Sequence, residues 1–146
     1  MSLAVIYSRA RLGLDAPLVT IEVHIAAGMP QFTIAGLPAT AVKESKHRVR
    51  SALLQSHFEF PSGRITINLA PADLPKEGGR FDLPIALGIL AATHQIPKSN
   101  LDQYEIAGEL ALSGEIRRIQ GALPFALHTK AANRALIMPK ENAIEA

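Results

Sequence analysis

The sequence predicts a single α/β domain, a sandwich in which helices pack mainly on one face of one mixed β-sheet. The chain has 146 residues, of which 48% are hydrophobic and 19% are charged, so it can bury a core of its own. Segments with the alternating pattern of strands come between segments with helical periodicity. Their order, approximately βββαβαββαβ, differs from the regular alternation of a doubly wound nucleotide-binding fold.

The first third of the chain is predicted to be β-structure. In residues 18–25, valine and isoleucine alternate with polar residues, which is the pattern of a half-buried strand. Residues 3–7 and 31–35 are shorter strands, and a Gly-Met-Pro turn at 28–30 lies between the second and the third. We therefore expect three strands before the first helix.

The period becomes helical over residues 41–56. Val42, Val49 and Leu53 fall on one face of this helix, so we expect that face to be apolar and buried.

The rest of the chain again alternates between strands and helices. Residues 82–93 form the second predicted helix, with Asp82 as its N-cap and Pro84 tolerated because it falls in the first turn. Ser113 and Gly114 have the sequence of a hairpin turn. The other predicted elements are strands at 64–70, 104–110, 115–119 and 135–138, a helix at 123–133, and a fourth helix from residue 139.

The composition favours a cytoplasmic protein without membrane contact. The chain has no cysteine, which suits a reducing cytosol. Its longest apolar stretch, residues 83–92, is too short to span a bilayer. At the N-terminus the apolar residues precede the arginines, the reverse of a secretion signal.

Few patterns in the sequence predict chemistry. The chain contains neither the Gly-Lys-Ser/Thr of a phosphate-binding loop nor the Gly-x-Ser-x-Gly of a serine hydrolase, and its five histidines lack the spacing of metal ligands. The glycines in residues 75–80 admit two interpretations. One is an anion site at the start of the second helix. The favoured one is a turn whose helix is capped by Asp82, which would compete with an anion for the same N–H groups.

The first helix carries the one cluster of charge that exceeds background. Lys43, Lys46, His47 and Arg50 lie within about a third of a turn, next to the apolar face, whereas Arg48 points elsewhere. The net charge is only +2, so any affinity for nucleic acid must come from such a local patch. A solvated helix face is the favoured interpretation, and contact with DNA phosphates is the alternative.

Several blocks of sequence, spread over nearly the whole chain, carry a family resemblance. They are GLP at 36–38, VKES and RVRSAL within 42–53, INLAPADLPKEG at 67–78, FDLPIAL at 81–87, GEL, GEIR and GALP within 108–124, and PKEN at 139–142. On these blocks the chain resembles the N-terminal, Lon-protease-like domain of the ComM/YifB-type magnesium-chelatase-like AAA+ ATPase family.

The resemblance implies a ribosomal protein S5 domain 2-like fold, which is also the fold of the Lon proteolytic domain. Lon-type peptidases use a serine and a lysine. The matching positions here are Arg80 and Pro124, which supply neither a hydroxyl nucleophile nor a side-chain proton acceptor. The resemblance therefore implies a domain that keeps the fold and has lost the catalytic dyad.

For the whole protein, the resemblance implies a C-terminal AAA+ module that uses ATP and magnesium, a homo-oligomeric ring that is hexameric, and DNA helicase activity in branch migration during natural transformation. This chain itself is expected to hold no cofactor or metal. Because it stops in a predicted helix with no closing strand, we expect residues 1–146 to be a domain truncated before that strand.

Two other functions compete with this interpretation. A divergent Ser/Lys peptidase would need an activated serine or threonine, and the sequence nominates none. A free-standing nucleic-acid-binding module is disfavoured because only 5% of the residues are aromatic, which leaves few platforms for base stacking.

Overall fold

The computed structural model describes residues 2–36 and 38–145. The helices are α1 (Thr40–Lys43), α2 (Ser45–Gln55), α3 (Asp82–Ala92) and α4 (Ala122–Ala131), with 3₁₀ turns at Leu101–Gln103 and Lys140–Asn142. The strands are β1 (Ser2–Arg9), β2 (Leu18–Ala26), β3 (Gln31–Ala35), β4 (Arg64–Ala70), β5 (Tyr104–Ile106), β6 (Glu109–Leu110), β7 (Ile116–Arg117) and β8 (Ala135–Ile137).

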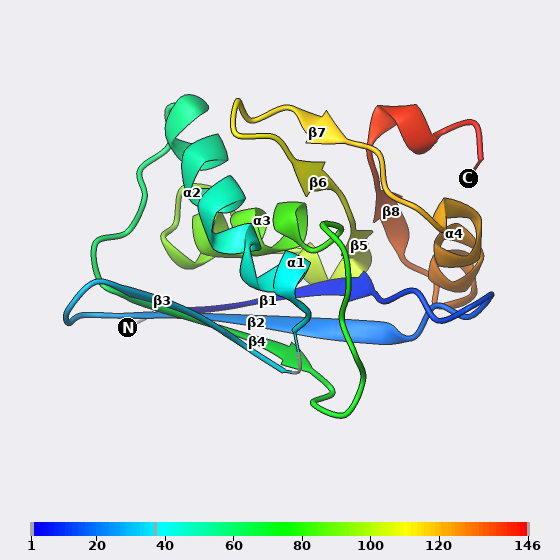
Figure 1. Ribbon diagram of the computed structural model, residues 1–146, viewed down its shortest axis with the longest axis horizontal. Coiled ribbons are helices and arrows are strands. Elements are labelled where there is room, and N and C mark those ends of the chain that lie inside the picture. The colour runs from blue at the N-terminus through cyan, green and yellow to red at the C-terminus, as the bar shows by residue number, and fades with distance from the viewer. Residues whose placement is uncertain (1, 37, 146) are drawn as a thin grey trace.

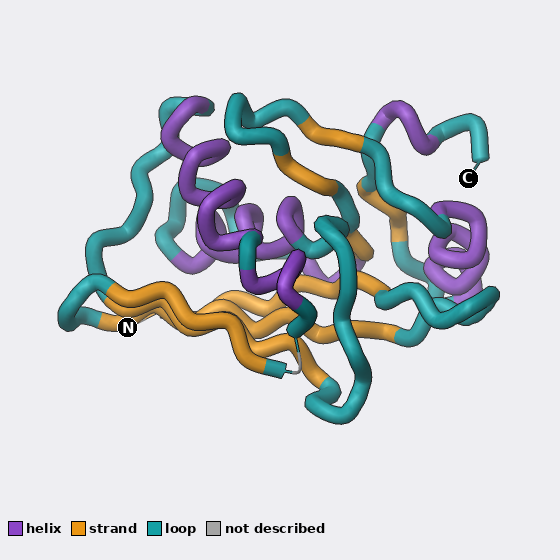
Figure 2. Tube along the Cα trace, in the orientation of Figure 1, coloured by secondary structure: helices purple, strands orange, loops and turns teal. Residues whose placement is uncertain are grey.

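Six strands form one mixed sheet in the order β3-β4-β2-β1-β5-β8. Strand β2 runs antiparallel to both of its neighbours, β4 and β1. The pairs β3–β4, β1–β5 and β5–β8 are parallel. Helices α1, α2 and α3 lie on one face of this sheet, and α4 lies at the end where β5 and β8 are found (Figure 1, Figure 2). The predicted α/β architecture, with helices mainly on one face of a mixed sheet, is confirmed.

Helix α3 is the centre of the core because it is covered on both sides. It packs on β1 and β2 on one side and on α2 and β6 on the other. It approaches the sheet closely at Gly88, where a Cβ atom would lie 2.5 Å from Val23 Cγ2. The apolar face predicted for the first helix is confirmed, since Val42, Val49 and Leu53 are all buried.

Two predicted elements are divided in the structure. The helix predicted over 41–56 is interrupted at Glu44, which separates α1 from α2. The strand predicted over 104–110 is split between the main sheet, where β5 lies, and a separate hairpin in which β6 pairs with β7. The cause of this split is the start of α3: the Gly108 N–H donates to the Arg80 carbonyl (2.9 Å), and the Gly108 carbonyl accepts from the Leu83 N–H (3.0 Å).

The fourth helix predicted from residue 139 is a single 3₁₀ turn. Asn142 is the last residue of this turn, and its side chain forms hydrogen bonds with the backbone of Ile119. Its amide oxygen accepts from the Ile119 N–H (2.9 Å), and its amide nitrogen donates to the Ile119 carbonyl (2.8 Å). The segment after β8 is thus attached to the loop before α4.

Asp82 does not cap its helix. It is the first residue of α3, the N-cap position is Phe81, and no side-chain cap bond forms. The fully buried Asp82 carboxylate instead accepts hydrogen bonds from the hydroxyl of Ser45, from Arg48 Nε (2.6 Å) and from the Leu110 N–H (3.0 Å). The prediction of an N-cap is wrong because the Asp82 carboxylate instead accepts hydrogen bonds from residues that are distant in the sequence.

Candidate functional site

The four predicted basic residues lie at one edge of the molecule. Lys43 belongs to α1, and Lys46, His47 and Arg50 belong to α2; Lys46 is half-buried and the other three are exposed. We call these four residues the basic surface. Arg48, which was predicted to point elsewhere, does so and is bound to Asp82.

The basic surface flanks the outermost strand of the sheet. Lys43 and Lys46 line a shallow hollow together with residues 31–34 of β3. The guanidinium of Arg50 lies 5.7 Å from the ring centroid of Phe60. Within the described part of the chain, no carboxylate forms an ion pair with any of the four basic side chains. Their positive charge is therefore directed at solvent along the edge of β3.

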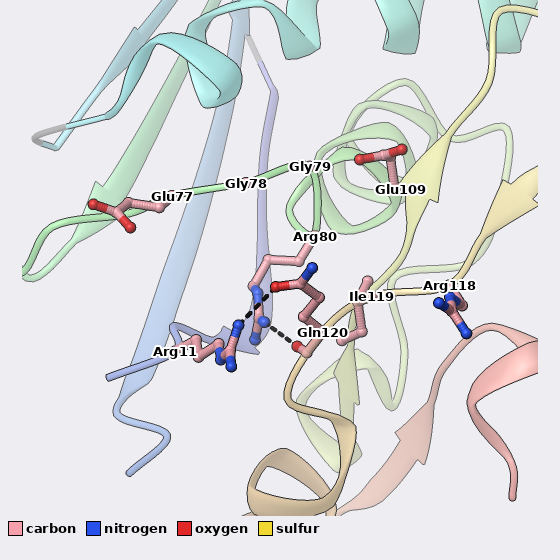
Figure 3. A pocket seen from close by; sticks show the side chains of 9 residues that line it. All are labelled: Arg11, Glu77, Gly78, Gly79, Arg80, Glu109, Arg118, Ile119 and Gln120. Atoms are coloured by element: carbon pink, nitrogen blue, oxygen red, sulfur yellow. Dashed lines mark hydrogen bonds between the residues drawn. The ribbon is translucent and has the colours of Figure 1, made fainter. Parts of the chain in front are cut away.

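A second site is a cavity of about 420 Å³ between the loop that enters α3 and the loop that enters α4 (Figure 3). We call it the arginine cavity. Three arginines, two glutamates, two glycines and two other residues form its wall: Arg11, Arg80, Arg118, Glu77, Glu109, Gly78, Gly79, Ile119 and Gln120. None of these side chains carries a hydroxyl or a thiol, so the wall supplies positive charge and hydrogen-bond donors and no nucleophile of the serine or cysteine type.

Arg80 is buried in the wall of this cavity, with 6% of its surface exposed. Its guanidinium donates to two backbone carbonyls, those of Arg9 (3.4 Å) and Gln120. Arg11 lies beside it and donates from Nη1 to the Gln120 side-chain oxygen (2.7 Å). Burial, and next to it the positive charge of Arg11, lower the pKa of Arg80 to about 10.

The structure brings together the two segments that the sequence resemblance matches to the Lon dyad. Arg80 contacts Gln120, and Pro124 follows four residues later in the first turn of α4. The α4 N-cap, Gly121, has a φ of 74°, a left-handed conformation that favours glycine. The loop before α3 and the loop before α4 are therefore in contact, and neither position 80 nor position 124 carries a serine or a lysine.

Metal and membrane features can be assessed for residues 2–36 and 38–145. There, His, Asp and Glu side chains form no group of three that could hold a metal ion. No helix in those ranges has the length and apolar character needed to cross a bilayer.

Comparison with known proteins assigns the family. Residues 21–142 match the family described as subunit ChlI of Mg-chelatase. The chain belongs to this Mg-chelatase-like family. It is 58% identical over all its 146 residues to competence protein ComM of Haemophilus influenzae, 57% identical over 145 residues to protein YifB of Salmonella typhimurium, and 37% identical over 147 aligned positions to protein Mb2921c of Mycobacterium bovis. The chain spans 29% of the length of each of these relatives.

In this Mg-chelatase-like domain, sequence reasoning found only part of the arginine cavity. Residues 75–80 were singled out as a turn before a helix. Arg11, Arg118 and Gln120 were not, because they come from segments remote from that turn. No local pattern predicts that Arg80 is buried, because arginine is rarely buried and its burial here depends on the tertiary packing of α3.

Proposed function

We propose that the chain is a non-catalytic, Lon-like N-terminal domain of a ComM-type AAA+ ATPase and that it contacts DNA phosphates through the basic surface. The whole protein would bind ATP and magnesium in its AAA+ module and act as a hexameric ring on DNA in the cytoplasm. The identity of 58% with ComM over the whole chain supports this assignment.

The observation that carries the DNA contact is the lack of ion pairs in the basic surface. Lys43, Lys46 and Arg50 form no ion pair with a carboxylate in the described chain. Three free cations on one side match a row of phosphates, and they carry no code for bases. His47 adds a fourth charge when it is protonated.

The non-catalytic role is supported by the two positions that correspond to the Lon dyad. Arg80 stays buried and donates to carbonyls, so it supplies no nucleophile. Pro124 has no side-chain group that accepts a proton. The wall of the arginine cavity beside Arg80 is better suited to binding an anion than to attacking a peptide bond.

Affinity is expected to depend on the number of copies. A single domain with three phosphate contacts should bind with the dissociation constant of non-specific complexes, on the order of 10⁻⁴ to 10⁻⁶ M. A ring that presents several copies to one DNA molecule raises the effective concentration of each, so the assembled protein should bind far more tightly.

The experiment is fluorescence anisotropy with labelled duplex and forked DNA over a series of salt concentrations. The test variant carries Lys43→Glu, Lys46→Glu and Arg50→Glu. We expect it to bind more weakly and to flatten the plot of log K against log salt by about two to three units of slope. The matched control carries Arg117→Glu, Lys130→Glu and Lys140→Glu, which changes the net charge equally at exposed positions on β7, α4 and the last 3₁₀ turn.

Equal losses of affinity in the two triple variants would assign the effect to net charge and contradict the proposal. Unchanged binding in the test variant would do the same, and would leave the basic surface as a solvated helix face or a contact between subunits. Circular dichroism of each variant verifies that the fold is intact.

A further inference from the structure

Arg80 is the exception among the arginines that reach into the interior of this protein. Arg9, with 7% of its surface exposed, is neutralised by Glu105, and Arg48 is neutralised by Asp82. Arg80 is buried equally well, and among the described residues its partners are the carbonyl oxygens of Arg9 and Gln120. A charge in the interior is costly unless an opposite charge is close. Arg9 and Arg48 each have such a partner, whereas Arg80 lacks one among the described residues.

The positive charge at this place is increased by its neighbours. Arg11 shares Gln120 with Arg80, and Arg118 lies in the same cavity wall. Burial, and after it repulsion by the positive charge of Arg11, lower the pKa of Arg80. A negative ligand would offset the cost of this buried positive charge and would stabilise the folded protein.

The glutamates of the arginine cavity do not relieve it. Neither Glu77 nor Glu109 forms an ion pair with an arginine in the described residues. The Glu109 carboxylate lies against Gly79, where a Cβ atom would meet its side chain. In Figure 3 both glutamates are drawn well away from the Arg11 and Arg80 guanidinium groups. The uncompensated charge is therefore concentrated at one end of the cavity, next to Gln120.

We propose that the arginine cavity binds a phosphomonoester, with the phosphate group between the guanidinium groups of Arg11 and Arg80 and with Arg118 at the rim. Guanidinium groups present planar forks of N–H donors that match phosphate oxygens. A phosphomonoester carries about −1.5 to −2 charges near pH 7, which balances two arginines where one carboxylate balances a single arginine. The volume of about 420 Å³ leaves room for the group that carries the phosphate.

This site is separate from the basic surface. It is built from the segments around residues 11, 78–80 and 118–120, whereas the basic surface belongs to α1 and α2. The two proposals therefore stand independently, and variants of one site should not alter binding at the other.

Thermal unfolding with methyl phosphate as the ligand tests the proposal. Ionic strength is kept constant with sodium chloride, so that only the anion changes. At a tenfold excess over the dissociation constant, mass action predicts a rise in Tm of about 4 °C for a domain of this size. Dimethyl phosphate, a diester with a single charge, represents the backbone of a polynucleotide and should give a much smaller rise.

Two variants locate the effect. Arg80→Met replaces the guanidinium by an apolar chain of similar length, and we expect it to fold and to lose the rise in Tm. Arg11→Gln changes an exposed side chain, so it reports on the site even if the Arg80 variant fails to fold. It should weaken methyl phosphate at least fivefold. Arg64→Gln, which removes an exposed guanidinium from β4, is the matched control and should keep the full rise.

Equal rises in Tm for wild type and Arg11→Gln would overturn the proposal and leave Arg80 as a structural link between the Arg9 and Gln120 segments. Equal rises with methyl phosphate and sodium chloride would overturn it as well. Stabilisation by dimethyl phosphate equal to that by methyl phosphate would overturn the assignment to a monoester.

Discussion

Arg48 Nε lies 2.6 Å from Asp82 Oδ2, and this contact joins α2 to the first residue of α3. The same carboxylate accepts the hydroxyl of Ser45 and the N–H of Leu110 in β6. One buried side chain thus connects two helices and the hairpin. The hydrogen bond with Asp82 raises the pKa of Arg48, which holds this arginine firmly in its charged form.

Loss of the Asp82 charge is expected to be strongly destabilising. Asp82→Asn keeps the shape of the side chain and leaves Arg48 facing a neutral group in a largely buried place. We expect the free energy of unfolding to fall by about 3 kcal/mol, as for other buried pairs that lose one partner. Urea denaturation measures it, with the exposed Asp102→Asn as the control, and equal stabilities of the two variants would contradict the role of Asp82.

Asp82 also illustrates where sequence reasoning ends. An aspartate at the start of a predicted helix is a good N-cap by local rules. The true partners, Ser45, Arg48 and Leu110, come from segments 28 to 37 residues away, so no local pattern identifies them. By contrast, the burial of Val42 and Val49 follows from a helical period alone, and it was predicted correctly.

Glu105 should make the free energy of unfolding decrease as the pH is lowered into the acid range. Burial alone would raise the pKa of this carboxyl group, but hydrogen bonds from Arg9, Thr129 and Arg134 prevail and lower it below its ordinary value. A lowered pKa in the folded state means that the folded protein binds the proton less readily than the unfolded chain. The contribution of ionised Glu105 to the free energy of unfolding is therefore complete above the pKa of the unfolded chain, about 4.3. It is lost as the pH falls through the lower pKa of the folded state.

The measurement is the slope of unfolding free energy against pH between about 4.3 and 2.5. Glu105→Gln should be less stable than wild type at pH 7 and should have a flatter slope in this range. Glu115→Gln removes an exposed carboxyl group and serves as the control. A Glu105→Gln curve parallel to that of wild type would show that the pKa of Glu105 is not lowered on folding.

The arginine cavity is a second feature that the sequence alone does not predict. Its charge comes from Arg11 after β1, Arg80 before α3 and Arg118 after β7, and these segments meet only because β1 and the loops before α3 and α4 converge. Each arginine alone has the sequence context of a surface residue. The basic surface was predictable because its members lie within eight residues of one another and follow a helical period.

Ser8 and Ser45 are both fully buried, and their hydroxyl groups should affect stability in opposite directions. Ser8 Oγ has no hydrogen-bond partner among the described residues, whereas Ser45 Oγ donates to Asp82. Ser8→Ala removes an unsatisfied polar group and should raise the free energy of unfolding by about 1 kcal/mol. Ser45→Ala should lower it by about 1–2 kcal/mol, because a buried carboxylate loses a donor. Chemical denaturation of the pair is a matched comparison, and a loss of stability in both would show that Ser8 has a partner.

Gly88 sets the distance between α3 and the sheet. Gly88→Ala would gain about 1 kcal/mol of helix propensity. The added Cβ would lie 2.5 Å from Val23 Cγ2, and overpacking of this kind costs about 1–3 kcal/mol. We expect a net loss of stability. Val23→Ala should relieve the clash, so the double variant should be more stable than the sum of the two single changes predicts, and strict additivity would show that no clash exists.

Arg80→Ser is expected to create no peptidase. A serine hydroxyl becomes a nucleophile only when a neighbouring base removes its proton. In Lon-type enzymes that base is a lysine, and the sequence resemblance matches it to Pro124 here. The Arg80 guanidinium has beside it Arg11, which is cationic and cannot accept a proton, and the carbonyls of Arg9 and Gln120. The carboxylates of the cavity, Glu77 and Glu109, form no ion pair with Arg80 among the described residues, so neither is held at this side chain. A fluorophosphonate probe, which labels only activated serines, should therefore react with Arg80→Ser no faster than with wild type. An active serine hydrolase in the same assay verifies the probe. Rapid labelling at position 80 would contradict this prediction and mean that the cavity already contains a base. Labelling of wild type itself would contradict the proposal of a non-catalytic domain.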